Sequence, residues 1–200
     1  DSLEIHLWQY RLLEIIIKSY YAEIDLVITN GNIRYREKIG TKLRRNWRYI
    51  SFYVFSIIDE RIFRVSPNAF ELIDASILVG SAPQIEVKTT STKTVERINN
   101  GDIEKISKYN LDVLIRFGFG ILTGEILELP KYGVWSYHHG DSAVNRGAPS
   151  GFWEVMENIE ETGSTLQIIN EELDAGLVLY ESYGQTDRRS VHRNRNSCYW

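Results

Sequence analysis

Cysteine is almost absent from this chain of 200 residues, which contains a single one, Cys198. One cysteine excludes a disulfide framework or a thiolate metal cluster within the chain, and it favours a reducing, cytoplasmic location. Long apolar runs are also missing, so no segment reaches the roughly 20 residues of a transmembrane helix. Near the N-terminus, Glu4, His6 and Arg11 interrupt the apolar run that a signal peptide would need. Residue 1 is aspartate, so we expect the sequence to be part of a longer chain.

An excess of positive charge is missing as well. The chain has 23 lysine and arginine residues against 27 aspartate and glutamate residues, a net charge of -4, which argues against nucleic acid as its main partner. The exception is the segment 31–48, which contains one acid, Glu37, and seven basic residues: Arg34, Arg36, Lys38, Lys42, Arg44, Arg45 and Arg48. We interpret this segment as a solvated helix face, with contact to a phosphorylated substrate or an acidic surface as the alternative.

What the chain does contain is an alternation of helical and strand patterns. The expected helices are 3–20, 49–63, 100–109, 125–129 and 151–159, with Asn100 or Asp102 capping the third and Ser150 capping the last. The expected strands are 24–29, 85–88, 111–117, 134–138, 165–169 and 177–182. This alternation predicts an α/β fold with a mostly parallel sheet, which binds ligands at the carboxyl ends of its strands.

Three glycines follow the strand 111–117, namely Gly118, Gly120 and Gly124. Their spacing departs from the GxGxxG fingerprint of dinucleotide-binding sites, and no acidic residue ends the next strand to hold a ribose. A tight turn that needs small residues and a turn whose backbone contacts a flat heterocycle therefore stay open beside dinucleotide binding.

The strand 134–138 ends in two histidines within the sequence SYHHGD at 136–141. Side chains next to each other on a strand point to opposite faces, so His138 and His139 should diverge unless the strand ends between them, which disfavours a shared metal ion. A catalytic histidine would need a nearby carboxylate to orient it, and the acidic turn 171–176 offers Asp174. Histidines that only form hydrogen bonds at a strand end are the alternative. Arg146 lies in the loop that follows the two histidines. It either binds an anion or belongs to a loop that only connects two elements.

The stretch Leu111–Ser182 resembles the catalytic domain of the folate-dependent formyltransferases, which include glycinamide ribonucleotide, methionyl-tRNA and sugar N-formyltransferases. The resemblance rests on the order of short motifs along the chain. They are LIRFGFGIL at 114–122, Ser136-Tyr137-His138 where the family has Asn-x-His, Arg146-Gly147 with Pro149, Thr162-Gly163-Ser164-Thr165, and Glu172-Leu173-Asp174-Ala175-Gly176. It implies a Rossmann-like α/β fold with flanking helices, in which the family's first strand, expected before the helix 3–20, is missing.

The resemblance also implies roles for individual residues. His138 and Asp174 match the catalytic pair, and Ser136 stands where the family has an asparagine that donates to an oxyanion. The residues that match the pterin-binding parts are Phe119, Gly120, Ile121, Leu122, Ile169 and Glu171. Substrate contacts are expected from Arg146, His139 and Asp141, and no metal is expected.

The activity implied is formyl transfer from 10-formyltetrahydrofolate, a co-substrate, to the amine of a small acceptor such as an amino sugar. Hydrolysis of the formylfolate and folate binding without catalysis are the alternatives. A transfer RNA acceptor is disfavoured by the acidic balance, although the basic segment 31–48 keeps it open. We expect a catalytic domain at 1–183 with an insertion at 31–80, and a tail or the start of a further segment at 184–200. No membrane association is expected, and a homo-oligomer is left open.

Overall fold

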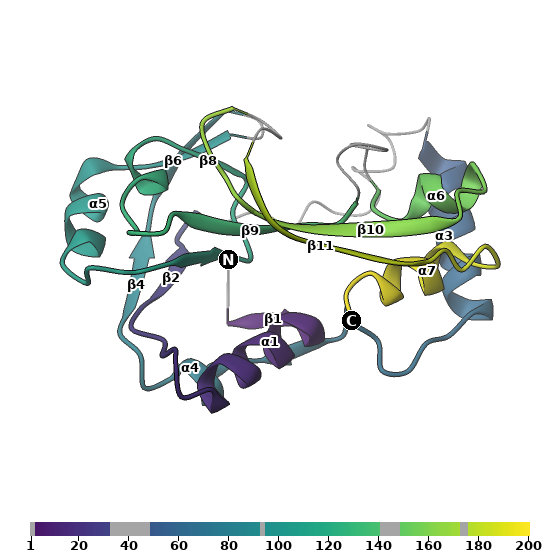
Figure 1. Cartoon of the computed structure of the whole chain (residues 1–200), viewed down its shortest axis with the longest axis horizontal. Coiled ribbons are helices and arrows are strands. Elements are labelled where there is room, and N and C mark those ends of the chain that lie inside the picture. Colours follow the sequence, from purple (N-terminus) through teal and green to yellow (C-terminus); the bar gives the residue numbers. More distant parts are fainter. Residues whose placement is uncertain (1–2, 33–48, 93–94, 141–148, 173–175) are drawn as a thin grey trace.

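The computed structural model describes residues 3–32, 49–92, 95–140, 149–172 and 176–200 (Figure 1). Its largest sheet has four strands in the order β11-β10-β9-β7. Strand β7 (Leu114–Arg116) runs parallel to β9 (Val134–His138), and β10 (Glu161–Ile168) is antiparallel to both β9 and β11 (Leu177–Gln185). This sheet holds the strand on which the predicted catalytic histidine lies.

Smaller sheets flank the main one. Strand β2 (Val27–Asn30) pairs in parallel with β4 (Gln84–Val87). Strand β6 (Val95–Ile98) pairs with antiparallel β5 (Thr89–Thr92) and parallel β8 (Ile121–Thr123). Strand β1 (Glu4–His6) is antiparallel to β3 (Leu72–Asp74). The α/β, Rossmann-like class is confirmed, and among the described strands parallel and antiparallel pairings are mixed, because short connections such as that from β10 to β11 permit only antiparallel neighbours.

The predicted helices lie at the right positions along the chain, but the helices of the structure are shorter than predicted. They are α1 (Leu7–Lys18), α3 (Ile50–Ile62), α4 (Ser76–Val79), α5 (Asn100–Ser107), the 3-10 helix η2 (Glu125–Leu127), α6 (Phe152–Met156) and α7 (Val191–Ser197). None of them, over the part of the chain that the structure describes, is long and apolar enough to cross a membrane. Helices α3, α6 and α7 gather at one end of the long strands β10 and β11, and α5 lies at the other (Figure 1).

Two predicted helix caps are wrong. The cap of α5 is Asn99, whose side-chain oxygen accepts a hydrogen bond from the backbone N–H of Asp102 at 2.9 Å, so neither Asn100 nor Asp102 caps it. Helix α6 starts after Gly151, which has a φ of +69°, and no side-chain oxygen caps it. A left-handed residue at this point is best filled by glycine, and this leaves Ser150 outside the cap position.

The main hydrophobic core lies between α5 and the strands β4, β6, β8 and β9. Its fully buried members include Ile106 of α5 and Val134, the first residue of β9. Burying a side chain of this size stabilises the fold by about 1.5–3 kcal/mol. The core therefore fixes one end of β9, while the other end carries His138.

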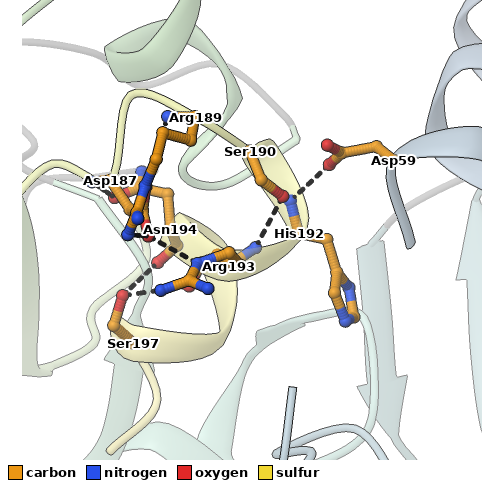
Figure 2. Close-up of polar contacts among 8 residues, drawn as sticks. All are labelled: Asp59, Asp187, Arg189, Ser190, His192, Arg193, Asn194 and Ser197. Atoms are coloured by element: carbon orange, nitrogen blue, oxygen red, sulfur yellow. Dashed lines mark hydrogen bonds and ion pairs between the residues drawn. The ribbon is translucent and has the colours of Figure 1, made fainter. Parts of the chain in front are cut away.

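The C-terminal segment is bonded to the rest of the structure through α7, which packs against α3 and α6. The backbone N–H of His192 donates to the Asp59 carboxylate of α3 at 2.7 Å (Figure 2). The amide nitrogen of Asn194, which is 1% exposed, donates to the carbonyl of Gly151 at 3.0 Å and to the hydroxyl of Thr162 at 3.0 Å. Buried polar contacts of this kind hold α7 in a single position.

A cavity of about 1360 Å³ lies beside the main sheet and is lined by α1, β2 and β7. The resemblance predicted a strand ahead of the helix 3–20 that this sequence does not contain. Strand β1 lies ahead of α1, but it pairs with β3 and not with β2 or β7. Arg116, at the end of β7, is among the residues that line the cavity.

Candidate active site

Strand β9 presents two chemically different faces. Ser136 and His138 share one face, and their neighbours across the sheet on β10 are Gln167 and Thr165. Ser136 is only 2% exposed, whereas His138 is half-buried at the end of the strand. The histidine that the resemblance identifies as catalytic therefore lies at the carboxyl end of a strand, where ligands of such sheets bind.

Arg116 lies directly beside Ser136, because the parallel register of β7 and β9 pairs these two residues. The Arg116 Nε and Nη2 atoms donate to the Ser136 hydroxyl oxygen at 3.1 and 2.8 Å. The Nη1 atom donates to the carbonyl oxygen of Gly120 at 2.7 Å. The guanidinium thus joins the end of β7, the middle of β9 and the turn that the resemblance assigns to the pterin.

Arg116 is half-buried at the edge of the cavity. Burial lowers the pKa of Arg116, and the negative charge of Glu96 on β6 acts in the opposite direction. Glu96 is itself 5% exposed and accepts a hydrogen bond from the Asn30 side chain at 3.0 Å. Because an arginine keeps its proton at neutral pH even in buried sites, the pair Arg116–Ser136 carries a fixed positive charge.

The two predicted pterin-binding segments are brought together. The backbone N–H of Gly124 donates to the Glu171 carboxylate at 2.7 Å. Phe119, in a left-handed conformation with a φ of +59°, packs against the main core, as does Ile169. Leu122 is 3% exposed and belongs to that core. Glu171 thus contacts Gly124, two residues beyond the first predicted segment, and the ligand-binding roles of both segments stay predictions.

His139 directly follows β9 and lies in an aromatic cluster with Tyr137, which is on the other face of the strand. Its ring stacks on Tyr199 with centroids 3.6 Å apart, and the rings of Tyr137 and Trp8 lie 4.6 and 5.4 Å away. Burial lowers the pKa of His139 to about 3, helped by the charges of His138 and Arg195, so its imidazole is neutral at physiological pH. Within the described ranges, no three histidine, cysteine, aspartate or glutamate side chains gather as a metal site.

Three of the predicted site residues, Asp141, Arg146 and Asp174, lie outside the described residues, as does most of the basic segment 31–48. The orientation of His138 by Asp174 therefore stays a prediction from the resemblance. Glu171, the first residue of the acidic turn, is described and contacts Gly124.

Arg116 is the residue that sequence reasoning missed. A signal was present: it is the one charged side chain in LDVLIRF at 111–117 besides Asp112, and it lies where an apolar strand ends. Buried charges are rarely kept without a partner, so an arginine near the carboxyl end of a buried strand is a candidate site residue.

Comparison with known proteins finds sequence similarity to formyltransferases. No protein-family model matches the chain. A methionyl-tRNA formyltransferase of Prochlorococcus marinus is 41% identical over 78 residues, which are 38% of this chain and 23% of that protein. The same enzyme from a second strain of this species is 35% identical over 101 residues, 50% of this chain and 30% of that protein. The chain is a relative of the formyltransferases.

The formyltransferase fold extends over nearly the whole chain. A phosphoribosylglycinamide formyltransferase from Anaplasma phagocytophilum superimposes with a TM-score of 0.60 at 14% identity, covering 96% of this chain and 72% of that structure. At this identity the likeness shows the fold alone. The matched segments span less than a third of the length of the two curated formyltransferases.

Proposed function

We propose that this chain catalyses transfer of the formyl group of 10-formyltetrahydrofolate to the amine of a small acceptor. The observation that carries the proposal is the position of His138 at the carboxyl end of β9, on the same face as the polar pair Ser136–Arg116. The sequence similarity to formyltransferases supports the reaction class.

In the proposed reaction the amine nitrogen attacks the formyl carbon, and negative charge develops on the formyl oxygen. The amine must then lose a proton, and the folate nitrogen must gain one as its bond to the formyl carbon breaks. In this proposal His138 would stabilise the oxygen or move the proton, and a general acid or base of this kind contributes roughly 100- to 10,000-fold in rate. Asp174 would orient the imidazole and favour its charged form.

The acceptor class in this proposal is a small amine, and an amino sugar is the first to test. The related proteins are named for methionyl-tRNA, but the net charge of -4 opposes binding to a phosphate backbone. A small acceptor needs no extended basic surface, so it fits the composition better.

The test is consumption of 10-formyltetrahydrofolate by the full-length protein, with and without a panel of amino sugars and other amines. Turnover that requires one amine supports the proposal and identifies the acceptor class. Release of formate without any amine would instead make the protein a formylfolate hydrolase. Folate binding without turnover in either assay would reduce the chain to a binding domain.

A further inference from the structure

We propose that Arg116 is a catalytic residue, which together with Ser136 binds the negatively charged oxygen that forms during the reaction. This inference rests on the proposed formyl transfer. It concerns a position where the chain departs from the family motif, since Ser136 stands where the resemblance predicts an asparagine amide.

The hydrogen bonds of Arg116 leave donors free. A guanidinium has five N–H groups. The Ser136 hydroxyl takes two of them, from Nε and Nη2, and the carbonyl of Gly120 takes a third, from Nη1. One N–H on each terminal nitrogen is therefore left without an acceptor among the described residues. Two N–H groups in a fixed plane match the requirements of an anionic oxygen.

The Ser136 hydroxyl is also left as a donor. Its oxygen has two lone pairs, and both receive hydrogen bonds from Arg116. The hydroxyl hydrogen must therefore point away from the guanidinium, and no described residue accepts it. A hydroxyl whose oxygen already binds a cation is a stronger donor than an isolated one, because hydrogen bonds in a chain polarise each other.

The position of this pair relative to His138 suits one reacting carbonyl group. Same-face positions on a strand are separated by roughly 7 Å along its axis, which is the spacing from Ser136 to His138. A formyl oxygen bound between them can accept from the Arg116–Ser136 pair while His138 serves the attacking or leaving nitrogen. Donors fixed before the reaction in a site shielded from water stabilise developing charge most strongly.

In the competing account Arg116 has only a structural role, which is to link β7, β9 and the turn at Gly120. The two accounts differ in what a replacement should restore. If the role is structural, any side chain that recovers the packing restores activity. If Arg116 is an oxyanion donor, only a group that again offers N–H donors at this place restores activity.

The experiment compares the full-length wild-type protein with Arg116→Met, Arg116→Lys and the double variant Arg116→Met/Ser136→Asn. The rate of 10-formyltetrahydrofolate consumption is measured with and without added guanidinium chloride at non-denaturing concentration. Arg188→Met, which alters an exposed arginine away from β9, is the matched control. Thermal melting of each variant shows whether it folds.

We expect Arg116→Met to lower kcat by roughly 100- to 1000-fold with little change in the KM for the folate. Free guanidinium, or the asparagine in the double variant, should recover part of the loss. If Arg116→Met does not fold, Arg116→Lys decides the question, because a lysine keeps the charge but cannot reproduce the two-donor geometry, and its kcat should still fall.

Wild-type turnover together with a fully active Arg116→Met or Arg116→Lys protein would overturn this inference and leave the proposed function standing. Loss of activity that neither guanidinium nor the asparagine recovers would favour the purely structural role of Arg116. Absence of turnover by the wild-type protein in every acceptor assay would remove the proposed function, and this inference would fall with it.

Discussion

Strand β9 ends between two neighbouring histidines whose surroundings differ. His138, half-buried at the end of the strand, shares a face with Ser136, which accepts hydrogen bonds from the Arg116 guanidinium. His139, just beyond the strand, packs against Tyr137 of the other face and is covered by Tyr199 and Trp8, and burial lowers its pKa to about 3. The comparison teaches that two adjacent residues of one type can differ, one half-buried beside polar side chains and the other a neutral ring in an aromatic packing cluster.

The difference follows from the position of each residue and not from its type. His138 is the last residue of β9 and His139 follows it, so the two identical residues enter environments that the flanking elements define. On the aromatic face these elements are α1 and the C-terminal end of the chain, which supply Trp8 and Tyr199. On the other face they are β7 and the turn at Gly120.

The largest effect on kcat is expected from substituting each histidine on its own. His138→Ala should lower kcat by roughly 100- to 10,000-fold without unfolding the protein, since it removes the proposed acid or base. His139→Phe preserves a stacked ring, so kcat should stay near the wild-type value, with any loss confined to the KM of the acceptor. Steady-state kinetics of formylfolate cleavage check this, and a fully active His138→Ala protein would break the comparison.

A smaller effect concerns the helix behind the aromatic face. Asn194→Ala removes hydrogen bonds to Gly151 and Thr162 and one from the backbone N–H of Asp187. Leaving such buried groups unpaired should lower the free energy of unfolding by about 1–3 kcal/mol. Urea unfolding measures the loss, with the exposed Gln185→Ala as a control that should shift stability by less than about 0.5 kcal/mol. An Asn194→Ala variant with unchanged free energy of unfolding would show that the Asn194 contacts of α7 do not stabilise the aromatic face.

Acid should distinguish the faces through His139. Its pKa falls from 6.5 in the unfolded chain to about 3 in the folded protein, so below pH 6.5 only the unfolded chain gains this proton. Its contribution to stability is thus complete above pH 6.5 and decreases as the pH falls toward about 3. At pH 5 the decrease is at most about 2 kcal/mol. Urea unfolding at pH 7 and pH 5 should show a larger acid loss for the wild type than for His139→Phe, and equal losses would contradict the burial of the ring.

The smallest effect is expected at the surface of the α7 region. Arg189 pairs with Asp187 at 2.9 Å, and the Arg189 side chain is 68% exposed. Exposed ion pairs contribute about 0–1 kcal/mol, so Arg189→Ala should barely change the free energy of unfolding at physiological salt. A loss as large as that of Asn194→Ala would mean that surface charge, and not the buried amide, holds the helix in place.

Much of the fold could be predicted from local pattern. The strand 134–138 coincides with β9, and the apolar segment 49–63 is α3 within one residue at each end. Strands β5, β6 and β8 were not predicted, because the stretches TTST, VERI and ILT are short and mixed in polarity. Their pairing depends on partners far along the chain, which no window of sequence contains.

The sequence by itself determined that Ser136 and His138 share one face of a strand, since a strand has a period of two, and the order of its motifs indicated the relation to formyltransferases. Only the tertiary structure decided what each histidine meets. Arg116 reaches Ser136 because β7 and β9 are in parallel register, and Tyr199 covers His139 because the C-terminal segment is anchored next to β10 through Asn194. Contacts between distant segments depend on how whole elements pair and pack, and no local window of the sequence contains the partners.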